Sequence, residues 1–417
     1  MRILILAPYA PYPPHGGGTM RIYHILRLLA ADHRVVCLCF VADEAAERAL
    51  APLRAICTVQ TVRGPQRRAV SRRAWDTLSS PLPDMALRNA SVAYRAALIE
   101  LLRRETFDVV QAESIEMARY LADAPRGLLT VLDQFNAEYV LQRRTALTAL
   151  AELCRPAAPQ RALRHLAGGG YSLVQSLKLA RYERCMLRTA DRIIAVSEAD
   201  RAALLALGGD PLRMVVAPNG VDAAFFSRAA LARAGGATLT FVAPTLVFSG
   251  TLDYRPNVDA LGWFCAHVLP LIRATHPQVR LLAVGKRPDA AVQHLAARGD
   301  LTLTGEVADV RPYLTGAAVY VLPMRIGGGI RLKLLEGLAL EVPLVSTALG
   351  AEGIPEIEHG RQLLLADTPQ TFAAAVNRLL EDRELAARLA TAGRELAERY
   401  DWGTIVPKIV AAYSNRM

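Results

Sequence analysis

Glycines, cations and one acid follow one another in an order that suits a phosphorylated sugar ligand. Gly327–Gly329 precede a segment with helical apolar spacing, which predicts a helix over residues 330–340. A helix start behind bare glycines offers free N–H groups and the positive end of the helix dipole, and both suit a phosphate. Arg331 and Lys333 lie in the first turn, where cations oppose the dipole, so an anionic ligand explains them better than helix stability does. Glu336 follows one turn later and is placed to accept hydrogen bonds from hydroxyl groups; the alternative is a surface helix with a simple Lys333–Glu336 pair.

Two strand-like segments flank this helix and would hold it in place. Residues 318–322 are an apolar run that Pro323 ends, because proline has no N–H for a sheet. Residues 342–346 form a second run after the helix. The order of strand, glycine turn, helix and strand predicts a parallel α/β unit around the ligand site.

The start of the chain has a similar pattern. An apolar strand at residues 2–7 leads into PYPPHGGG, and Thr19 is a candidate cap for a helix over residues 20–30. A strand, a glycine-rich loop and a helix are typical of the opening of a nucleotide-binding fold. We therefore expect the backbone at Gly17 and Gly18 to approach a ligand closely, although a flexible turn is the alternative.

Two acidic residues end strand-like segments in the first half of the chain. Glu113 follows the strand expected at residues 108–111, and Asp133 follows the one expected at 128–132. Either carboxylate is a candidate for catalysis, and a structural cap or ion pair is the open alternative. No Asp-x-Asp pair occurs, so the sequence predicts neither a metal-held diphosphate nor any other metal site.

Length and the alternation of elements predict two domains. A chain of 417 residues exceeds one ordinary core, and strands alternate with helices in both halves. We expect an N-terminal domain over residues 1–226, a linker at 227–238, a C-terminal domain at 239–397 and a last helix within 398–417. Residues 155–170, with two prolines and a glycine run, predict an irregular insertion. Six scattered cysteines without a CxxC pair indicate no disulfide framework and no zinc site.

The net charge of +10 is uneven along the chain. Residues 1–225 hold 29 Lys and Arg against 21 Asp and Glu, including an arginine cluster between Arg63 and Arg73. Such a surface attracts nucleic acid, anionic lipid or acidic glycans. No nucleic-acid-binding motif accompanies the charge, so we expect no nucleic-acid partner. The cluster is either a solvated loop or a patch for a membrane or an acceptor phosphate.

Longer phrases of the sequence resemble one protein family. These are YERCMLRTADRIIAVSEAD from Tyr182, PNGVD from Pro218, FSGTLDYRPN from Phe248 and PMRIGGGIRLKLLEGLA from Pro323. With the early glycine loop, they resemble family 4 glycosyltransferases over nearly the whole chain, most of all those of bacterial polysaccharide assembly. The resemblance implies the GT-B fold, in which two Rossmann-like doubly wound domains face a cleft, with the last helix crossing back to the N-terminal domain.

The resemblance also implies a nucleoside-diphosphate sugar as donor substrate, without a cofactor. Glu336 matches the second glutamate of the family's signature, which takes the ribose hydroxyls, whereas the first falls at Gly328. The backbone N–H groups of Gly327–Gly329 or the carboxylate of Glu352 would then replace it. The family's basic pair after the first strand of the second domain is also missing, so the phosphates are assigned to Arg331 and Lys333. The expected donor-binding residues are Gly17, Gly18, Gly250, Gly328, Gly329, Ile330, Arg331, Lys333 and Glu336, and the catalytic candidates are Glu113, Asp133 and Glu352.

The family further implies transfer with retention to a glycan acceptor, commonly a lipid-linked one, in cell-surface polysaccharide synthesis. No signal-peptide pattern opens the chain, so we expect a cytoplasmic protein, peripheral at an anionic inner-membrane surface. Two alternatives stay open at this point. One is a sugar-nucleotide epimerase on the same architecture, and the other is a non-catalytic partner that has kept the donor site.

Overall fold

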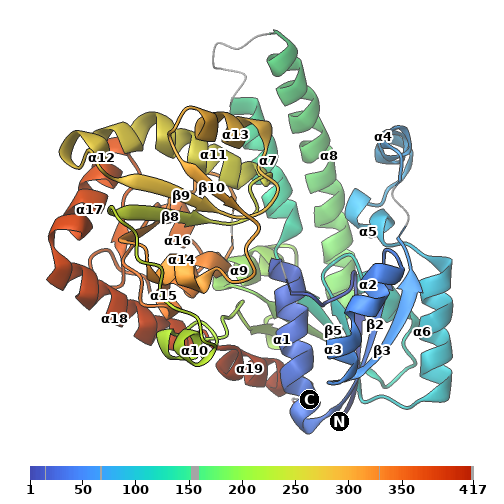
Figure 1. The fold of residues 1–417 in the computed structure, drawn as a ribbon. Coiled ribbons are helices and arrows are strands. Elements are labelled where there is room, and N and C mark those ends of the chain that lie inside the picture. Colours follow the sequence, from blue (N-terminus) through green and yellow to red (C-terminus); the bar gives the residue numbers. More distant parts are fainter. Residues whose placement is uncertain (15, 66–67, 152–158, 328, 415–417) are drawn as a thin grey trace. The chain divides into compact units, whose positions relative to one another are not determined.

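The computed structural model describes residues 1–14, 16–65, 68–151, 159–327 and 329–414, with the side chains of 159–165 excepted. Contacts divide the chain into two compact units. The first contains residues 1–218 and 405–417, and the second contains residues 219–404. Each unit is built on its own parallel sheet (Figure 1).

The first unit has a seven-stranded sheet in the order β3-β2-β1-β4-β5-β6-β7. Its strands β1 and β2 are almost continuously buried, as expected for a parallel sheet covered on both faces. The strands are β1 (Arg2–Ala7), β2 (Arg34–Val41), β3 (Thr58–Arg63), β4 (Val109–Glu113), β5 (Leu129–Gln134), β6 (Arg192–Ala195) and β7 (Met214–Val216). The order reverses between β1 and β4, so their carboxyl ends meet at the switch point where such sheets bind ligands.

Helices cover both faces of this sheet. Because crossovers between parallel strands are right-handed, the reversal of strand order places α1 and α6 on opposite sides (Figure 1). The helices are α1 (Gly17–Asp32), α2 (Glu44–Ala49), α3 (Ala51–Arg54), α4 (Val70–Ser79), α5 (Asp84–Arg88), α6 (Val92–Arg104), α7 (Glu138–Ala151), α8 (Pro159–Thr189) and α9 (Glu198–Ala206). Short 3₁₀ turns at Ala118–Asp123 and Pro211–Arg213 complete the unit.

Two sequence predictions for the first unit are wrong in detail. Helix α1 begins at Gly17, three residues before the predicted start, and Gly16 rather than Thr19 is its N-cap. Residues 159–170 are not irregular but belong to the long helix α8. Glycine costs about 1 kcal/mol in a helix, but Gly169 lets α8 pack closely on α7, where an added Cβ would lie 3.3 Å from Leu150. The packing of α8 on α7 therefore outweighs the low helix propensity of the glycines.

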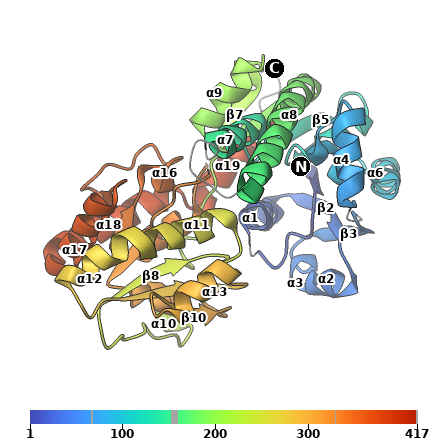
Figure 2. The ribbon, with the colours of Figure 1, turned by 90° about the horizontal axis from the view of Figure 1, so that it is seen from above.

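The second unit has a six-stranded parallel sheet in the order β10-β9-β8-β11-β12-β13. Its strands are β8 (Thr245–Ser249), β9 (Arg280–Val284), β10 (Thr302–Gly305), β11 (Val319–Leu322), β12 (Leu344–Ser346) and β13 (Leu364–Leu365). Its helices are α10 (Arg228–Arg233), α11 (Arg255–Trp263), α12 (Leu269–Thr275), α13 (Ala290–Ala297), α14 (Arg311–Thr315), α15 (Leu332–Ala339), α16 (Ala348–Ala351), α17 (Pro369–Glu381) and α18 (Arg383–Arg399). A π-helical turn, Phe264–Val268, joins α11 to α12, so the two run end to end along one side of the unit (Figure 2). The predicted pair of doubly wound, Rossmann-like domains is confirmed.

The boundaries between the units differ from the predicted ones. The first unit ends at Pro218, and residues 227–238, expected as a linker, contain α10 and belong to the second unit. The last helix, α19 (Trp402–Ser414), begins in the second unit, and its residues from Ile405 onward belong to the first. Over the residues that the structure describes, no helix has both the length and the apolar character needed to cross a membrane.

Candidate functional site

The switch point of the second sheet carries most of the predicted ligand-binding residues. The chain builds β8, β9 and β10 outward and then returns to place β11 beside β8. The carboxyl ends of β8 and β11 therefore meet, which is where parallel sheets of this kind bind ligands. Helix α15 begins ten residues after β11 and directs its first turn to this edge.

Lys333 is held at the end of β8. Its Nζ donates hydrogen bonds to the carbonyl oxygen of Ser249 and to Oδ1 of Asn257, both at 2.9 Å. The amide of Asn257 is itself fixed, since its Nδ2 donates to the carbonyl oxygen of Thr251 at 2.8 Å. The third polar neighbour of the ammonium is only the thioether of Met324 at 3.9 Å, a weak acceptor. One N–H of Lys333 is thus available for a stronger, anionic acceptor.

Burial favours the uncharged forms of both Lys333 and Glu336. Burial lowers the pKa of Lys333 to about 7, and the nearby positive charge of Arg331 adds to the effect. Burial raises the pKa of Glu336 to about 7, although Lys333 acts in the opposite direction. The side-chain carboxylate of Glu336 accepts no hydrogen bond from the described residues. Both groups change charge near neutral pH, which is typical of a ligand site rather than a surface ion pair.

Glycine and tyrosine bring α15 close to the sheet. A Cβ on Gly337 would lie 2.6 Å from the ring of Tyr320 on β11, so only glycine permits this approach. The hydroxyl of Tyr320 lies 2.5 Å from Oγ of Ser249, and burial raises the pKa of Tyr320 well above its usual value. Tyr320 therefore stays neutral and ties β11 to the end of β8 beneath the helix. The sequence did not single out Tyr320 or Asn257, because neither contact can be inferred from spacing along the chain.

Arg331 closes the glycine turn that precedes α15. The helix starts at Leu332, two residues later than predicted, and Arg331 is its N-cap. One of its Nη atoms donates to the carbonyl oxygen of Ile326 at 3.1 Å, whereas Nε is buried without a partner among the described atoms. Burial lowers the pKa of Arg331, and Tyr254 and Glu352 favour its charged form. Gly327 and Gly329 have φ of 113° and 72°, values that favour glycine.

The remaining predicted residues of this site lie around the same turn. Ile330 is buried, and its backbone nitrogen would be 2.9 Å from a Cβ on Gly353, so this turn packs against the segment after Glu352. Gly250 has φ of 143°, and a Cβ there would lie 2.8 Å from the Asn257 amide and 3.3 Å from Nζ of Lys333. Gly328 lies outside the described residues. The structure thus brings Gly250, Gly329, Ile330, Arg331, Lys333, Glu336 and Glu352 together within one unit.

The catalytic candidates of the first unit lie in a buried network. Asp133 has no exposed surface and accepts two hydrogen bonds from Arg21, from Nε at 2.7 Å and from an Nη at 2.9 Å. Arg21 also donates to the carbonyl oxygens of Ala217 and Pro218. Both carboxylate oxygens of Asp133 are therefore engaged by the guanidinium. The geometry favours a structural role for Asp133.

Glu113 is equally shielded from solvent. It pairs with Asp133 across β4 and β5, and burial next to that carboxylate raises its pKa well above the usual range. Gln111 donates to Glu113 at 2.7 Å and accepts a 2.5 Å hydrogen bond from the hydroxyl of Tyr413 on α19. The network therefore fixes the last helix to the first sheet. Gly18 has a similar packing role, since a side chain there would collide with Tyr9, and Gly17 lies beside it in the first turn of α1.

A different carboxylate of the first unit is partly exposed. Glu138 begins α7, directly beyond the carboxyl end of β5, and accepts a 3.2 Å hydrogen bond from Nδ2 of Asn136. Burial raises its pKa to about 7, a value suited to proton transfer. Glu138 carries no local signal in the sequence, because it lies four residues beyond the end of β5 rather than at the strand end itself.

The arginine cluster before α5 is mostly neutralised within the first unit. Arg68 binds Asp76 at 2.9 Å and Asp84 at 2.5 Å, and Arg73 binds Asp84 at 3.1 Å. Arg72 pairs with Asp76 at 3.0 Å. Pairing with these carboxylates reduces the positive charge that the three arginines can offer to an anionic surface, and their role at a membrane stays a prediction. Arg73 of α4 binds Asp84 of α5, and Arg68 joins the same carboxylate to Asp76 of α4.

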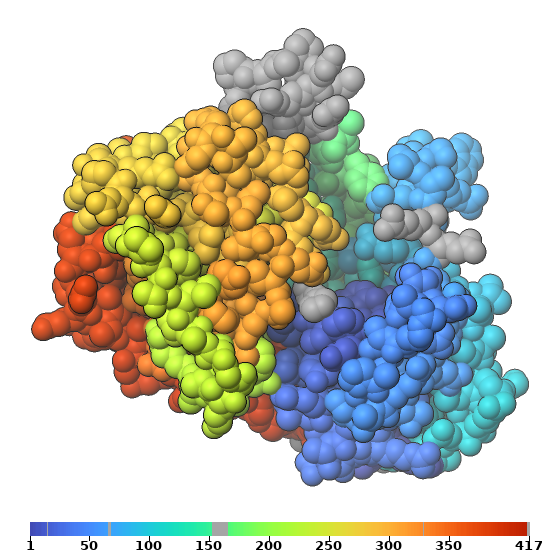
Figure 3. Space-filling view, viewed as in Figure 1, coloured from blue at the N-terminus to red at the C-terminus, as the bar shows by residue number. Residues whose placement is uncertain are grey.

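This inward pairing leaves apolar side chains on the outer face of α4. Val70, Trp75 and Leu78 are 80%, 63% and 84% exposed. Figure 3 shows this helix, in light blue, open to solvent on the pictured face. Arg67 lies outside the described residues. Neither unit shows a cluster of three or more metal-ligating side chains within the described residues.

Two family models match the chain. One, described as Glycosyltransferase Family 4, matches residues 15–225, which is more than half of the chain. The other, described as Glycosyl transferases group 1, matches residues 243–382. The chain belongs to glycosyltransferase family 4. The resemblance inferred from the sequence phrases is confirmed.

This family 4 member has relatives with assigned names. It is 30% identical over 256 residues to a phosphatidyl-myo-inositol mannosyltransferase of Mycolicibacterium smegmatis, covering 58% of this chain and 62% of that one. It is 26% identical over 255 residues to a D-inositol 3-phosphate glycosyltransferase of Kineococcus radiotolerans, covering 55% and 58%. The matches thus span less than two thirds of these relatives. HepE of Anabaena, solved in complex with UDP, has 18% identity with full coverage of both chains and a TM-score of 0.64, which shows a shared GT-B fold.

Proposed function

We propose that this protein is a glycosyltransferase that uses a nucleoside-diphosphate sugar held at the carboxyl edge of the second sheet. The observation that carries the proposal is the presence of two incompletely bonded side chains on α15. Lys333 has one N–H whose nearest acceptor is a weak one, and the carboxylate of Glu336 has no hydrogen-bond partner in the described chain. One residue offers a donor to phosphate, and the other offers an acceptor to ribose hydroxyls. Nε of Arg331, which is buried and has no partner among the described atoms, supplies a second phosphate donor.

The same residues would assist departure of the nucleoside diphosphate. Breaking the bond to the sugar builds negative charge on the leaving phosphate. Fixed donors aimed at that charge lower the barrier because they need no reorganisation during the reaction. Arg331 and Lys333 are held in place by Ile326 and by Ser249 with Asn257, so they are oriented before the donor arrives.

Nucleotide titration by calorimetry tests the donor site. We would titrate UDP, UDP-glucose and GDP-mannose, the first two because HepE was solved with UDP and the last because a relative is named a mannosyltransferase. Glu336→Ala should weaken binding at least tenfold, since a hydrogen bond to a charged group contributes roughly 1.5–3 kcal/mol. Glu395→Ala, at an exposed residue of α18, is the matched control and should bind as the wild type does. Unchanged affinity in Glu336→Ala would overturn the assignment.

We further propose that transfer retains the anomeric configuration, with Glu138 of the first unit and Glu352 of the second as separate candidates for the carboxylate that assists it. Glu138 is partly exposed at the edge of the first sheet, and Glu352 contributes to the electrostatics of Arg331. Product anomers assigned by NMR test retention. Glu138→Gln should lower kcat at unchanged nucleotide affinity. A product of inverted configuration would exclude the retaining mechanism, and formation of an epimerised sugar nucleotide without transfer would support the epimerase instead.

We propose a lipid-linked glycan acceptor of cell-surface polysaccharide synthesis, reached by peripheral contact with the inner membrane. The name of the phosphatidyl-myo-inositol mannosyltransferase relative supports an amphipathic acceptor, and the exposed apolar face of α4 supplies the contact. Because Arg68, Arg72 and Arg73 are paired internally, apolar insertion should contribute more than lipid charge does.

Liposome co-sedimentation tests the membrane contact. The double variant Trp75→Ser with Leu78→Ser should lose most binding, whereas Val92→Ser, at an 88% exposed residue of α6, is the control. Equal binding by the double variant and the wild type would exclude α4. Binding that needs anionic lipid and falls steeply with salt would instead restore a basic patch as the main contact.

A further inference from the structure

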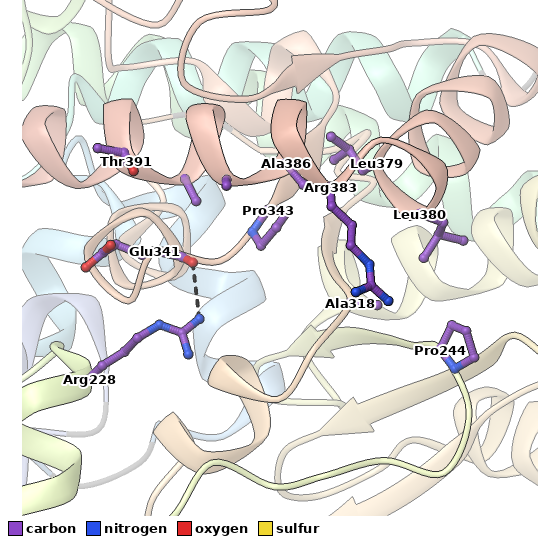
Figure 4. Close-up of a pocket in the computed structure, with 12 residues that line it drawn as sticks. Arg228, Pro244, Ala318, Glu341, Pro343, Leu379, Leu380, Arg383, Ala386 and Thr391 are labelled. Carbon is purple, nitrogen blue, oxygen red and sulfur yellow. Dashed lines mark hydrogen bonds between the residues drawn. The ribbon is translucent and has the colours of Figure 1, made fainter.

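The second unit contains another hollow, at the opposite end of its sheet from Lys333. Its volume is about 520 Å³. Its floor is formed by Pro244, Ala318 and Pro343, each just before the amino end of β8, β11 or β12 (Figure 4). The carboxyl ends of these strands carry the donor site, so the hollow is separate from it.

The walls of the hollow are mainly apolar. Leu379 and Leu380 come from the end of α17, and Ala386, Ala387 and Ala390 come from α18. Alanine at three positions along one helix keeps the space open, because any larger side chain there would fill it. A hollow of roughly 300–1,000 Å³ with mostly apolar walls and a few polar groups has the size and character of a small-molecule site.

Charged side chains lie at separate ends of this hollow. Arg383 lies beside Ala318 and Leu380 at one end, and Arg228 and Glu341 lie together at the other (Figure 4). Arg228 donates to the carbonyl oxygen of Glu341 at 3.3 Å. Within the described chain, the exposed guanidinium of Arg383 makes neither a hydrogen bond nor an ion pair. Arg383 is the first residue of α18, whose N-terminus is already capped by Asp382, which accepts a 2.8 Å hydrogen bond from the backbone nitrogen of Leu385.

We propose that this hollow binds an amphipathic organic anion, with its acidic group at Arg383 and its apolar body along the α17–α18 wall. Guanidinium and carboxylate form charge-assisted hydrogen bonds, and the apolar body would gain by leaving water. A cationic ligand of the same shape would place like charges together at Arg383. The inference does not depend on the proposed donor site.

The hollow lies next to the end of α15, the helix that carries part of the proposed donor site. Glu341 follows the end of α15 and has φ of 55°, an uncommon conformation for a residue with a side chain. Lys333 lies in the first turn at the other end of the same helix, and Glu336 lies near its middle. A ligand long enough to reach Glu341 would touch the segment that leaves α15, and its effect on donor binding can be measured.

Calorimetry with three eight-carbon probes tests the proposal. Octanoate should bind at least tenfold more tightly than 1-octanol or octylammonium, each used below its micelle-forming concentration. Arg383→Gln should abolish this preference, whereas Arg388→Gln, an exposed arginine of α18 that does not line the hollow, should retain it.

Ala387→Trp, at an exposed lining position, should block octanoate by filling the space, and Thr391→Trp is the second filling variant if the first does not fold. Octanoate affinity unchanged by Arg383→Gln, or unchanged in a folded filling variant, would overturn the site. Equal binding of octanoate and octylammonium to the wild type would exclude the anion preference.

Discussion

Donor binding should exchange protons with solvent in opposite directions on the two sides of pH 7. Lys333 and Glu336 both have pKa values of about 7 in the ligand-free protein, because burial disfavours their charged forms. A diphosphate beside Lys333 stabilises its charged form and raises its pKa. Ribose hydroxyls that donate to Glu336 stabilise the carboxylate and lower its pKa. Binding should therefore take up a proton at Lys333 and release one at Glu336.

The size of each exchange follows from these values. At pH 8 about nine-tenths of Lys333 is neutral in the free protein, and a shift of about two units on binding would make about nine-tenths charged. The uptake is then about 0.8 proton per nucleotide, while Glu336 is already ionised. At pH 6 the roles reverse, and Glu336 releases about 0.8 proton as its pKa falls by a similar amount. Affinity should fall as pH rises above 7, because neutral Lys333 must first be protonated.

The assay is calorimetry in buffers of different ionisation enthalpy, with a nucleotide sugar as ligand because its diphosphate has no terminal group that titrates near pH 6. Lys333→Gln should abolish the uptake at pH 8 and leave the release at pH 6. Glu336→Gln should do the reverse, since glutamine keeps an acceptor but cannot ionise. Tight binding by the wild type with no buffer-dependent heat at pH 8 would refute the assignment of Lys333 to the phosphates.

Three further outcomes are expected. Because Arg331 and Lys333 are proposed to neutralise the diphosphate, nucleotide binding and turnover should survive excess EDTA. If EDTA abolishes turnover and magnesium restores it, the diphosphate must instead be held by a metal ion. Arg21→Gln should destabilise the protein by about 3–5 kcal/mol in urea unfolding, since it leaves Asp133 buried without this partner; a cost below about 1 kcal/mol would show that the ion pair does not stabilise the fold. Gly337→Val should weaken nucleotide binding more than tenfold, because its side chain would meet the Tyr320 ring and lift α15 from the sheet; unchanged affinity would show that this close approach is not needed.

Local patterns predicted the fold and indicated where the proposed donor site lies. Apolar runs such as β1 and β11 have strand length and are bounded by proline or glycine, so their alternation with helices indicates a doubly wound sheet. The site could be located because Gly327, Arg331, Lys333 and Glu336 lie within ten residues of one another. A helix places such neighbours together without any knowledge of the rest of the fold.

Contacts between distant residues could not be predicted in this way. Arg21 and Asp133 are 112 positions apart, and nothing local marks them as partners. Glu113 and Asp133 therefore appeared available for catalysis, whereas the fold buries both. The arginines near residue 70 appeared to form a basic patch for the same reason, since Asp84 accepts from two of them only in the folded chain.

The position of Lys333 explains how the chain can lack the family's basic pair after β8. The resemblance led us to expect a basic pair after β8, but the segment from Gly250 to Tyr254 contains no cation. Nζ of Lys333 lies 3.3 Å from the position that a Cβ on Gly250 would occupy. The ammonium of Lys333 on α15 therefore lies at the end of β8, where the segment after the strand supplies no cation. Gly250 then has a physical reason to lack a side chain, because any Cβ there would crowd Asn257 and the ammonium. The same helix supplies Glu336, so the distance between the proposed phosphate and ribose contacts is set within one turn of α15 and does not depend on how two loops fold.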